Sequence, residues 1–331
     1  MDVHEAFASA TTYGYPKKQL QTVDDYIPQL KEIQEDLTVS GKGGAPLFCS
    51  VFRPENPRGT VLVLHGFTEN AYKYSELIYS LVRNQFDVVA YDQRGHGRSG
   101  RAEGISDPSV THVDRFEDYV EDLRIVCDTV LSGLPKPWTI FAHSMGGAVS
   151  ALFLEQYPDV FSAASLCAPM IAPNTGGIPS GAAGTLARTL CLLGKGKKKP
   201  FFMKAYSGPE DFETSCATDP ARFRWYDSVK YMNQEFRNSV PSCRWILESV
   251  AVTGKILAPG APESVRCPVL LSTADKDFSV MPEPQKEFIG RVPKGKHLFV
   301  KDSRHEIFRS VNAVLFPWWH EILTFLKEAE A

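Results

Sequence analysis

The sequence has no long apolar run, and its hydrophobic stretches are interrupted by charged residues or proline. A helix that crosses a bilayer needs about 20 consecutive apolar residues, so no membrane-spanning helix is predicted. The N-terminal stretch also lacks the basic region and apolar core of a secretory signal peptide. We therefore expect a cytoplasmic protein.

Cysteine pairs and excess charge are missing as well. The seven cysteines form no C-x-x-C motif, which argues against a disulfide framework or a zinc site and indicates reduced thiols. The formal net charge is only −3, so a nucleic-acid partner is not expected. The composition does not indicate an oligomeric state.

Metal and cofactor motifs are weak. His65, His96, His112 and His143 lack the i, i+4 spacing with a glutamate that is typical of a helical zinc site. The stretch GHGRSG, residues 95–100, matches G-x-G-x-x-G, but the polar residues after it open no apolar helix that could hold a pyrophosphate. We expect neither a metal nor a cofactor.

Short β-branched runs alternate with longer amphipathic runs along most of the chain. Strands are predicted over 34–53 as a hairpin and over 60–64, 87–91, 138–142, 163–167, 269–273 and 297–300. Helices are predicted over 72–84, 114–132, 146–157, 283–290 and 310–328. This alternation is typical of an α/β fold with a mostly parallel, doubly wound sheet, in which ligands bind beyond the carboxyl ends of the strands.

The alternation stops over residues 171–262, where glycine-rich NTGGIPSGAAG, basic GKGKKK and aromatic FRWYDSVKYMNQEF replace it. We interpret this segment as an insertion. It divides the predicted core into a first part, residues 1–170, and a second part, residues 263–331.

The stretch TIFAHSMGGAVS, residues 139–150, ends a predicted strand with a serine and two glycines. Serine is a common helix N-cap, so a purely structural role is one interpretation. The other is a nucleophile elbow, a tight strand-to-helix turn that exposes a strained serine above the sheet. That turn needs small residues two before and two after Ser144, where Ala142 and Gly146 stand.

A serine nucleophile needs a base and a third group that orients the base. On this fold the acid and the histidine follow the serine, each after one of the last strands. Asp275 and Asp277 follow the next-to-last predicted strand, and His305 follows the last one. The sequence thus offers Ser144, His305 and one of the two aspartates as a catalytic triad.

An oxyanion hole requires two further N–H donors. One is the residue after the nucleophile, Met145, and the other belongs to the loop after an early strand. In LHGFTEN, His65 and Gly66 let the chain turn directly at the strand end, so Phe67 is the second candidate. An ordinary strand-to-helix turn would explain this loop equally well if it stood alone.

These motifs resemble the α/β-hydrolase superfamily and, within it, the bacterial lysophospholipases and monoacylglycerol lipases. The resemblance runs in order from about residue 60 to residue 310, through LHGFTEN, YDQRGHGRSG, HVDRFEDYVEDL, AHSMGGA, CAPM, LLSTADKDFSV and DSRHEIFR. The chain departs from the family pattern at Ala142 and Ala274, where glycine is usual. Counted from Pro268, the family's acid falls on Asp277, with Asp275 as the second choice.

The resemblance implies an α/β-hydrolase fold in which residues 171–262 form a helical cap over the serine. His65, Trp225 and Tyr226 are then candidate substrate contacts, although the aromatic residues of the cap could equally form its own core. The segment 195–199, flanked by LCLL and FFM, contains Lys195, Lys197, Lys198 and Lys199. It is compatible with contact to an anionic membrane surface and with a solvated loop.

The activity implied by the resemblance is hydrolysis of a single-acyl lipid ester, such as a lysophospholipid or a monoacylglycerol, through an acyl-enzyme. A short-chain carboxylesterase and a peptidase would share the triad and differ in the cap. A non-catalytic, ligand-binding hydrolase fold is the alternative outside this class, and the intact triad pattern argues against it.

Overall fold

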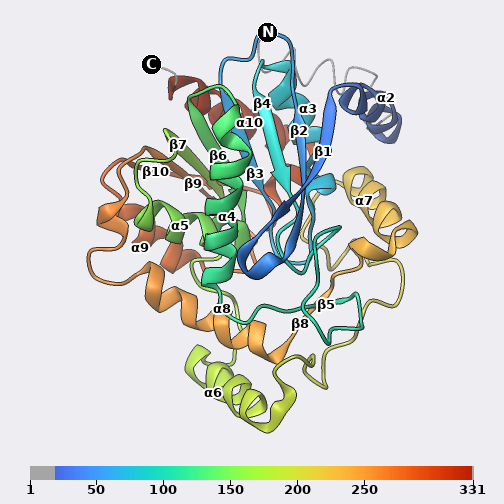
Figure 1. Ribbon diagram of the computed structural model, residues 1–331, viewed down its shortest axis with the longest axis vertical. Coiled ribbons are helices and arrows are strands. Elements are labelled where there is room, and N and C mark those ends of the chain that lie inside the picture. Colours follow the sequence, from blue (N-terminus) through green and yellow to red (C-terminus); the bar gives the residue numbers. More distant parts are fainter. Residues whose placement is uncertain (1–18, 330–331) are drawn as a thin grey trace.

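The central sheet of the computed structural model, which describes residues 19–329, has eight strands in the order β1-β2-β4-β3-β6-β7-β9-β10 (Figure 1). The pairs β1-β2 and β2-β4 are antiparallel and the other pairs of this sheet are parallel. The prediction of a mostly parallel sheet is confirmed. The strands are β1 (Gln34–Ser40), β2 (Pro46–Phe52), β3 (Thr60–Leu64), β4 (Asp87–Tyr91), β6 (Trp138–His143), β7 (Ala163–Cys167), β9 (Val269–Ala274) and β10 (Gly295–Val300).

Helices cover both faces of this sheet. One apolar core receives side chains from α4 (Glu117–Thr129), α5 (Met145–Gln156) and α9 (Pro282–Arg291). The other receives them from α2 (Gln19–Glu32), α3 (Ser75–Arg83) and α10 (Asn312–Glu328). Strand β3 is buried along its whole length, as expected of a strand covered on both faces. Within residues 19–329, no helix is long and apolar enough to cross a membrane.

The strands and helices predicted for the core are present, with small differences at their ends. The helix that the sequence did not predict is α2. Proline 28 lies inside it and polar residues outnumber apolar ones, so no apolar period stands out. Tyr26 and Leu30 are nevertheless buried, and Tyr26 stacks on Tyr79 of α3. Contact with the core, rather than local sequence, therefore stabilises this helix.

Between β7 and β9 the chain leaves the sheet and forms three helices and a short ladder. Asp219 caps α7 by accepting from two backbone N–H groups, with Pro220 in the first turn, and the Ser242 side chain caps α8. Strand β5 pairs with β8 in a separate two-stranded ladder. The elements are α6 (Ser180–Leu190), a π-helical turn (Cys191–Lys195), α7 (Pro220–Met232), a 3-10 turn (Gln234–Phe236), β8 (Val240–Pro241), α8 (Cys243–Ile256) and, from the core, β5 (Val110–Thr111).

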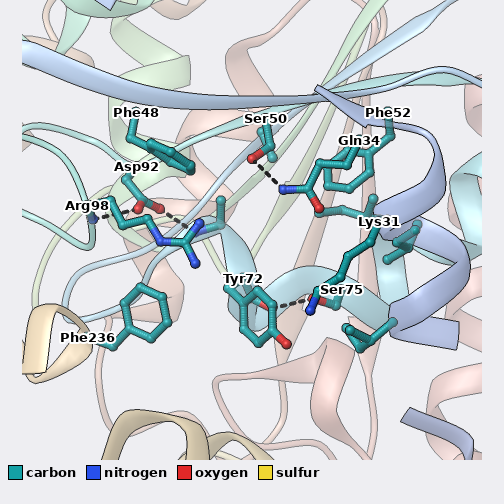
Figure 2. Close-up of a pocket in the computed structure, with 15 residues that line it drawn as sticks. Lys31, Gln34, Phe48, Ser50, Phe52, Tyr72, Ser75, Asp92, Arg98 and Phe236 are labelled. Carbon is teal, nitrogen blue, oxygen red and sulfur yellow. Dashed lines mark hydrogen bonds between the residues drawn. The ribbon is translucent and has the colours of Figure 1, made fainter. Parts of the chain in front are cut away.

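The α7 region is attached to the core by an ion pair and by cation–π contacts. Arg222, itself buried, donates to the two carboxylate oxygens of Glu76 over 2.6 and 2.7 Å. Figure 2 shows the Arg98 guanidinium near the rings of Phe48 in β2 and Phe236. The guanidinium lies 4.8 Å from the ring centroid of Phe48 and 5.5 Å from that of Phe236. A cation held between two rings ties the segment after α7 to the sheet.

Helix α6 is attached differently. It packs along α8, which lies between α6 and the helices on the sheet (Figure 1). Several large apolar side chains on α6 and in the turns beside it are exposed to solvent: Ile178, Leu186, Leu192, Leu193, Phe201 and Phe202.

Candidate active site

Ser144 lies at the turn between β6 and α5 in a strained backbone conformation. Its φ of 50° and ψ of −116° are unusual for a residue with a side chain. The turn is possible because helix α5 approaches β3 closely. A Cβ atom on Gly146 would lie 2.6 Å from the carbonyl oxygens of Leu64 and His65, so only glycine fits there. Ala142, the departure noted in the sequence, is completely buried.

Ser144, His305 and Asp277 form a continuous hydrogen-bonded chain. The Ser144 Oγ lies 2.8 Å from His305 Nε2, and His305 Nδ1 lies 2.7 Å from Asp277 Oδ2. All three side chains are largely buried. With the Nδ1 proton donated to the carboxylate, Nε2 is free to accept the serine proton, which is the arrangement that activates a hydroxyl as a nucleophile.

The environment of Asp277 keeps its carboxyl group ionised. Burial alone would raise its pKa, but the charge and hydrogen bond of His305 and the backbone N–H groups of Ser279 and Val280 lower the pKa below the usual value. Asp275 is exposed, and its Oδ2 accepts from the backbone N–H of Asp302 instead. Of the two candidate acids, Asp277 is therefore the one that the structure brings to His305.

The loop after β3 runs directly beside Ser144. A Cβ atom on Gly66 would lie 3.0 Å from the Ser144 Cβ, so this glycine allows the close approach that brings the backbone of Phe67 near the serine. Both ring nitrogens of His65 are engaged with backbone groups, one with the Gly66 carbonyl and one with the Gln93 N–H. His65, expected as a substrate contact, thus shapes this loop and has no ring nitrogen left for a substrate.

A buried carboxylate, Glu69, connects the loop to the elbow. Its Oε2 accepts from the Gly66 N–H over 2.7 Å and lies 3.0 Å from His143 Nδ1, while Oε1 accepts from Lys73 over 2.8 Å. Burial raises the pKa of Glu69, but the charges of Lys73 and His143 outweigh it and hold the pKa well below the usual value. The other His143 nitrogen lies 3.2 Å from the carbonyl oxygen of His305. Sequence patterns did not single out Glu69 or Lys73, because the partners that link them to the site, His143 and Glu306, are distant in the chain.

A large cavity, here called the apolar cavity, lies beneath α6 and α8. Its volume is about 540 Å³, and it extends from Phe67 to side chains such as Leu186, Leu190 and Ile246. The Phe67 ring packs against Trp245, with 4.0 Å between ring centroids. The cavity therefore reaches the loop beside Ser144 and is suited to a long apolar group.

Trp225 and Tyr226 are located elsewhere. Trp225 packs against Tyr72 and Tyr226 between α7 and the core, and the Tyr226 hydroxyl accepts from Asn70 over 2.7 Å. Neither lines the apolar cavity, but Tyr226 lines a smaller cavity of about 190 Å³ together with Thr68 and Glu306. The aromatic residue of the insertion that does so beside the serine loop is Trp245, on α8.

Comparison with known proteins identifies the family of this chain. Residues 55–311 match the model of the family described as serine aminopeptidase, S33. The chain belongs to this family. The S33 assignment confirms the resemblance to hydrolases that the sequence motifs indicated.

Individual relatives resemble the chain over most of its length or over part of it. Lysophospholipase L2 of Escherichia coli K12 is 30% identical over 312 residues, 89% of this chain and 88% of the relative. The monoglyceride lipase of Rattus norvegicus is 36% identical over 134 residues, 40% of this chain and 42% of the relative. The crystal structure of a soluble variant of monoglyceride lipase from Saccharomyces cerevisiae covers 90% of this chain and 96% of its own, with a TM-score of 0.69 and 20% identity. The fold of this S33 member is thus that of the α/β-hydrolases.

Proposed function

We propose that this protein is a serine hydrolase that cleaves carboxylic esters of single-acyl lipids, of the lysophospholipase or monoacylglycerol lipase type. The observation that carries the proposal is the hydrogen-bonded chain from Ser144 through His305 to Asp277, beside an apolar cavity of about 540 Å³. The names of the lysophospholipase and monoglyceride lipase relatives support the substrate class.

In the proposed mechanism, His305 Nε2 takes the proton of Ser144 while the serine oxygen attacks the ester carbonyl. The backbone N–H groups of Phe67 and Met145 stabilise the negative charge that develops on the carbonyl oxygen. The ester C–O bond then breaks, and the leaving alcohol receives the proton from His305. Water, activated by the same histidine, attacks the acyl-enzyme and releases the fatty acid and free Ser144. Asp277 holds the imidazole in the required tautomer throughout.

Residues 171–262 act as a cap in this proposal, on a core made of residues 1–170 and 263–331. The acyl chain lies in the apolar cavity between α6 and α8, next to Trp245. Because each buried methylene contributes about 0.8 kcal/mol, a cavity of this kind favours longer acyl chains until it is full.

The exposed edge of the cap contacts a lipid surface in this proposal. Leu192, Leu193 and Phe201 are 82%, 67% and 90% exposed, and Lys195 and Lys198 stand between them in the chain. Exposed apolar side chains beside lysines favour binding of a protein to an anionic membrane surface. Sedimentation with vesicles should show stronger binding to anionic than to zwitterionic vesicles and weaker binding for Leu192→Asp. Equal binding to both vesicle types would contradict the electrostatic part.

The test of the function is an ester series at fixed enzyme concentration. We expect release of fatty acid from decanoyl and longer monoacyl esters, at higher kcat/KM than for p-nitrophenyl acetate. A preference for the acetate would favour a short-chain carboxylesterase instead. Hydrolysis of aminoacyl p-nitroanilides without any ester hydrolysis would overturn the proposal in favour of a peptidase.

A further inference from the structure

A second cavity, here called the polar cavity, adjoins the apolar cavity at the loop beside Ser144. Its volume is about 190 Å³. Phe67 lines the apolar cavity, and the next residue, Thr68, lines the polar cavity. Glu306, the residue after His305, also lines it. The polar cavity is therefore lined by residues next in the chain to Phe67 and to His305, and it shares no lining residue with the apolar cavity.

The lining of the polar cavity carries three cationic and three acidic side chains, so its formal charges cancel: Lys73, Lys230, Arg309, Glu210, Asp227 and Glu306. Most of these charges are already paired. Lys73 donates to Glu306 over 2.5 Å, Arg309 donates to the other Glu306 oxygen over 2.6 Å, and Lys230 donates to Glu210 over 2.6 Å. A lining of this kind suits a ligand that has no net charge.

Within residues 19–329, two polar groups of the lining lack a hydrogen-bond partner, and a carboxylate of the lining lacks an ion pair. The Ser239 hydroxyl and the Arg309 Nε–H are buried and have no hydrogen-bond partner there. Among the same residues the Asp227 carboxylate has no ion-pair partner, although its Oδ1 accepts from the Glu210 backbone N–H. Buried donors without an acceptor are costly, so a ligand that supplies acceptor oxygens at this place would stabilise them.

We propose that the polar cavity binds the alcohol part of the substrate and that this part is a zwitterionic phosphodiester headgroup. The phosphate oxygens accept from Ser239 and Arg309, and the ammonium group is paired with Asp227. A neutral glycerol would leave Asp227 without a cation, and an anionic headgroup without an ammonium would bring a further negative charge to Asp227 and no cation to pair with it. This inference rests on the proposed function, because it assigns the cavity to the leaving alcohol of the same ester.

The test compares one acyl chain on three leaving groups. Decanoyl lysophosphatidylethanolamine, monodecanoylglycerol and p-nitrophenyl decanoate are assayed with the wild type, Asp227→Asn and Ser239→Ala. The asparagine keeps the oxygen that accepts from Glu210 and loses only the charge. We expect kcat/KM for the zwitterionic substrate to fall about tenfold in both variants, with the other two substrates changed less than twofold. Asp159→Asn, which removes an exposed acid paired with Arg266, is the matched control and should change none of the three.

Equal losses on all three substrates would overturn the headgroup assignment, as would a wild type that prefers monodecanoylglycerol or decanoyl lysophosphatidic acid. Binding separates this proposal from the proposed function. In Ser144→Ala, which has no nucleophile, calorimetry should still show binding of decanoyl lysophosphatidylethanolamine and about tenfold weaker binding after Asp227→Asn is added. If the wild type hydrolyses no ester but this difference persists, the proposed function fails and the headgroup site stands. If the difference is absent, the headgroup site fails.

Discussion

The two cavities, lined at Phe67 and at Thr68 respectively, differ in size and lining. The apolar cavity measures about 540 Å³ and is bounded by α6 and α8, whose neighbouring apolar side chains are exposed. The polar cavity measures about 190 Å³ and is bounded by α7 and by buried ion pairs such as Lys73–Glu306. Contact between apolar surfaces has no preferred direction, whereas hydrogen bonds and ion pairs do.

The difference teaches how one triad can recognise both ends of a substrate. The apolar cavity discriminates by the amount of surface that a ligand buries, and therefore by chain length. In the proposal above, the polar cavity discriminates between headgroups by the positions of their charges and hydrogen-bonding groups. An ester with a long chain on one side and a polar alcohol on the other would be oriented across Ser144 by this contrast alone.

The largest expected effect comes from removing the nucleophile, which every substrate needs whichever cavity it occupies. Ser144→Ala should lower kcat by about a thousandfold or more on every ester, because it removes the covalent step. A fluorophosphonate probe should label the wild type and leave the variant unlabelled, with unchanged thermal unfolding as the control. Equal labelling of the two proteins would place the nucleophile elsewhere.

The next effect separates the two candidate acids. Asp277→Asn should reduce kcat by about a hundredfold or more on all esters, because an amide no longer fixes the imidazole tautomer. Asp275→Asn is the matched control and should retain nearly full activity, since Asp275 accepts only from a backbone N–H near the surface. The opposite ranking in steady-state assays would transfer the role to Asp275.

A smaller effect would test the apolar cavity alone. Trp245→Ala should reduce the gain in kcat/KM per added acyl carbon, which we expect to be roughly three- to fourfold in the wild type. Trp225→Ala removes the same type of side chain outside this cavity and should leave the gain unchanged. The slope of log(kcat/KM) against chain length, measured from acetyl to dodecanoyl esters, checks both. A steeper loss for Trp225→Ala would reverse the assignment of the acyl site.

The smallest expected effect concerns the ion pairs under the polar cavity. Burial would raise the pKa of Glu306, but the charges of Lys73 and Arg309 lower it to about 2. The folded-state pKa of Glu306 lies below the unfolded value of about 4.5. The ion pairs of Glu306 with Lys73 and Arg309 therefore stabilise the fold fully above that pH. The stabilisation is lost as the pH falls from about 4.5 towards 2.

Urea unfolding at several pH values measures this stabilisation directly. Glu306→Gln should make the free energy of unfolding depend less steeply on pH over that window. Glu321→Gln, at an exposed ion pair with Lys296, should retain the wild-type slope. An unchanged slope in Glu306→Gln would show that this carboxylate does not contribute.

Much of the core could be predicted because its signals are local. Strand β3 is a continuous run of five buried residues, and the turn at Ser144 requires small neighbours that are visible in the sequence. The serine, the acid and the histidine each follow a strand of one parallel sheet, so they could be expected to meet at one edge of it. The choice between Asp275 and Asp277 rested on the resemblance, because both follow the same strand.

What could not be predicted depends on contacts between distant residues. Lys73 reaches Glu306, 233 positions later in the chain, and no pattern of spacing reveals such a pair. Trp225 and Trp245 are both aromatic residues of the insertion, and only the packing of α7 and α8 decides which of them lines the apolar cavity. Helix α2 was missed for the same reason, since its stability comes from contact with α3.

The contacts of Arg98 with Phe48 and Phe236 restrict which part of the insertion can move. Together with the Arg222–Glu76 ion pair, they hold the α7 side of the insertion against the core. If these contacts persist while the apolar cavity widens, the elements that move are α6 and the turns beside it. Amide protons of α6 should accordingly exchange with deuterium faster than those of α7. The apolar cavity could then widen to admit the acyl chain while the α7 residues that line the polar cavity keep their positions.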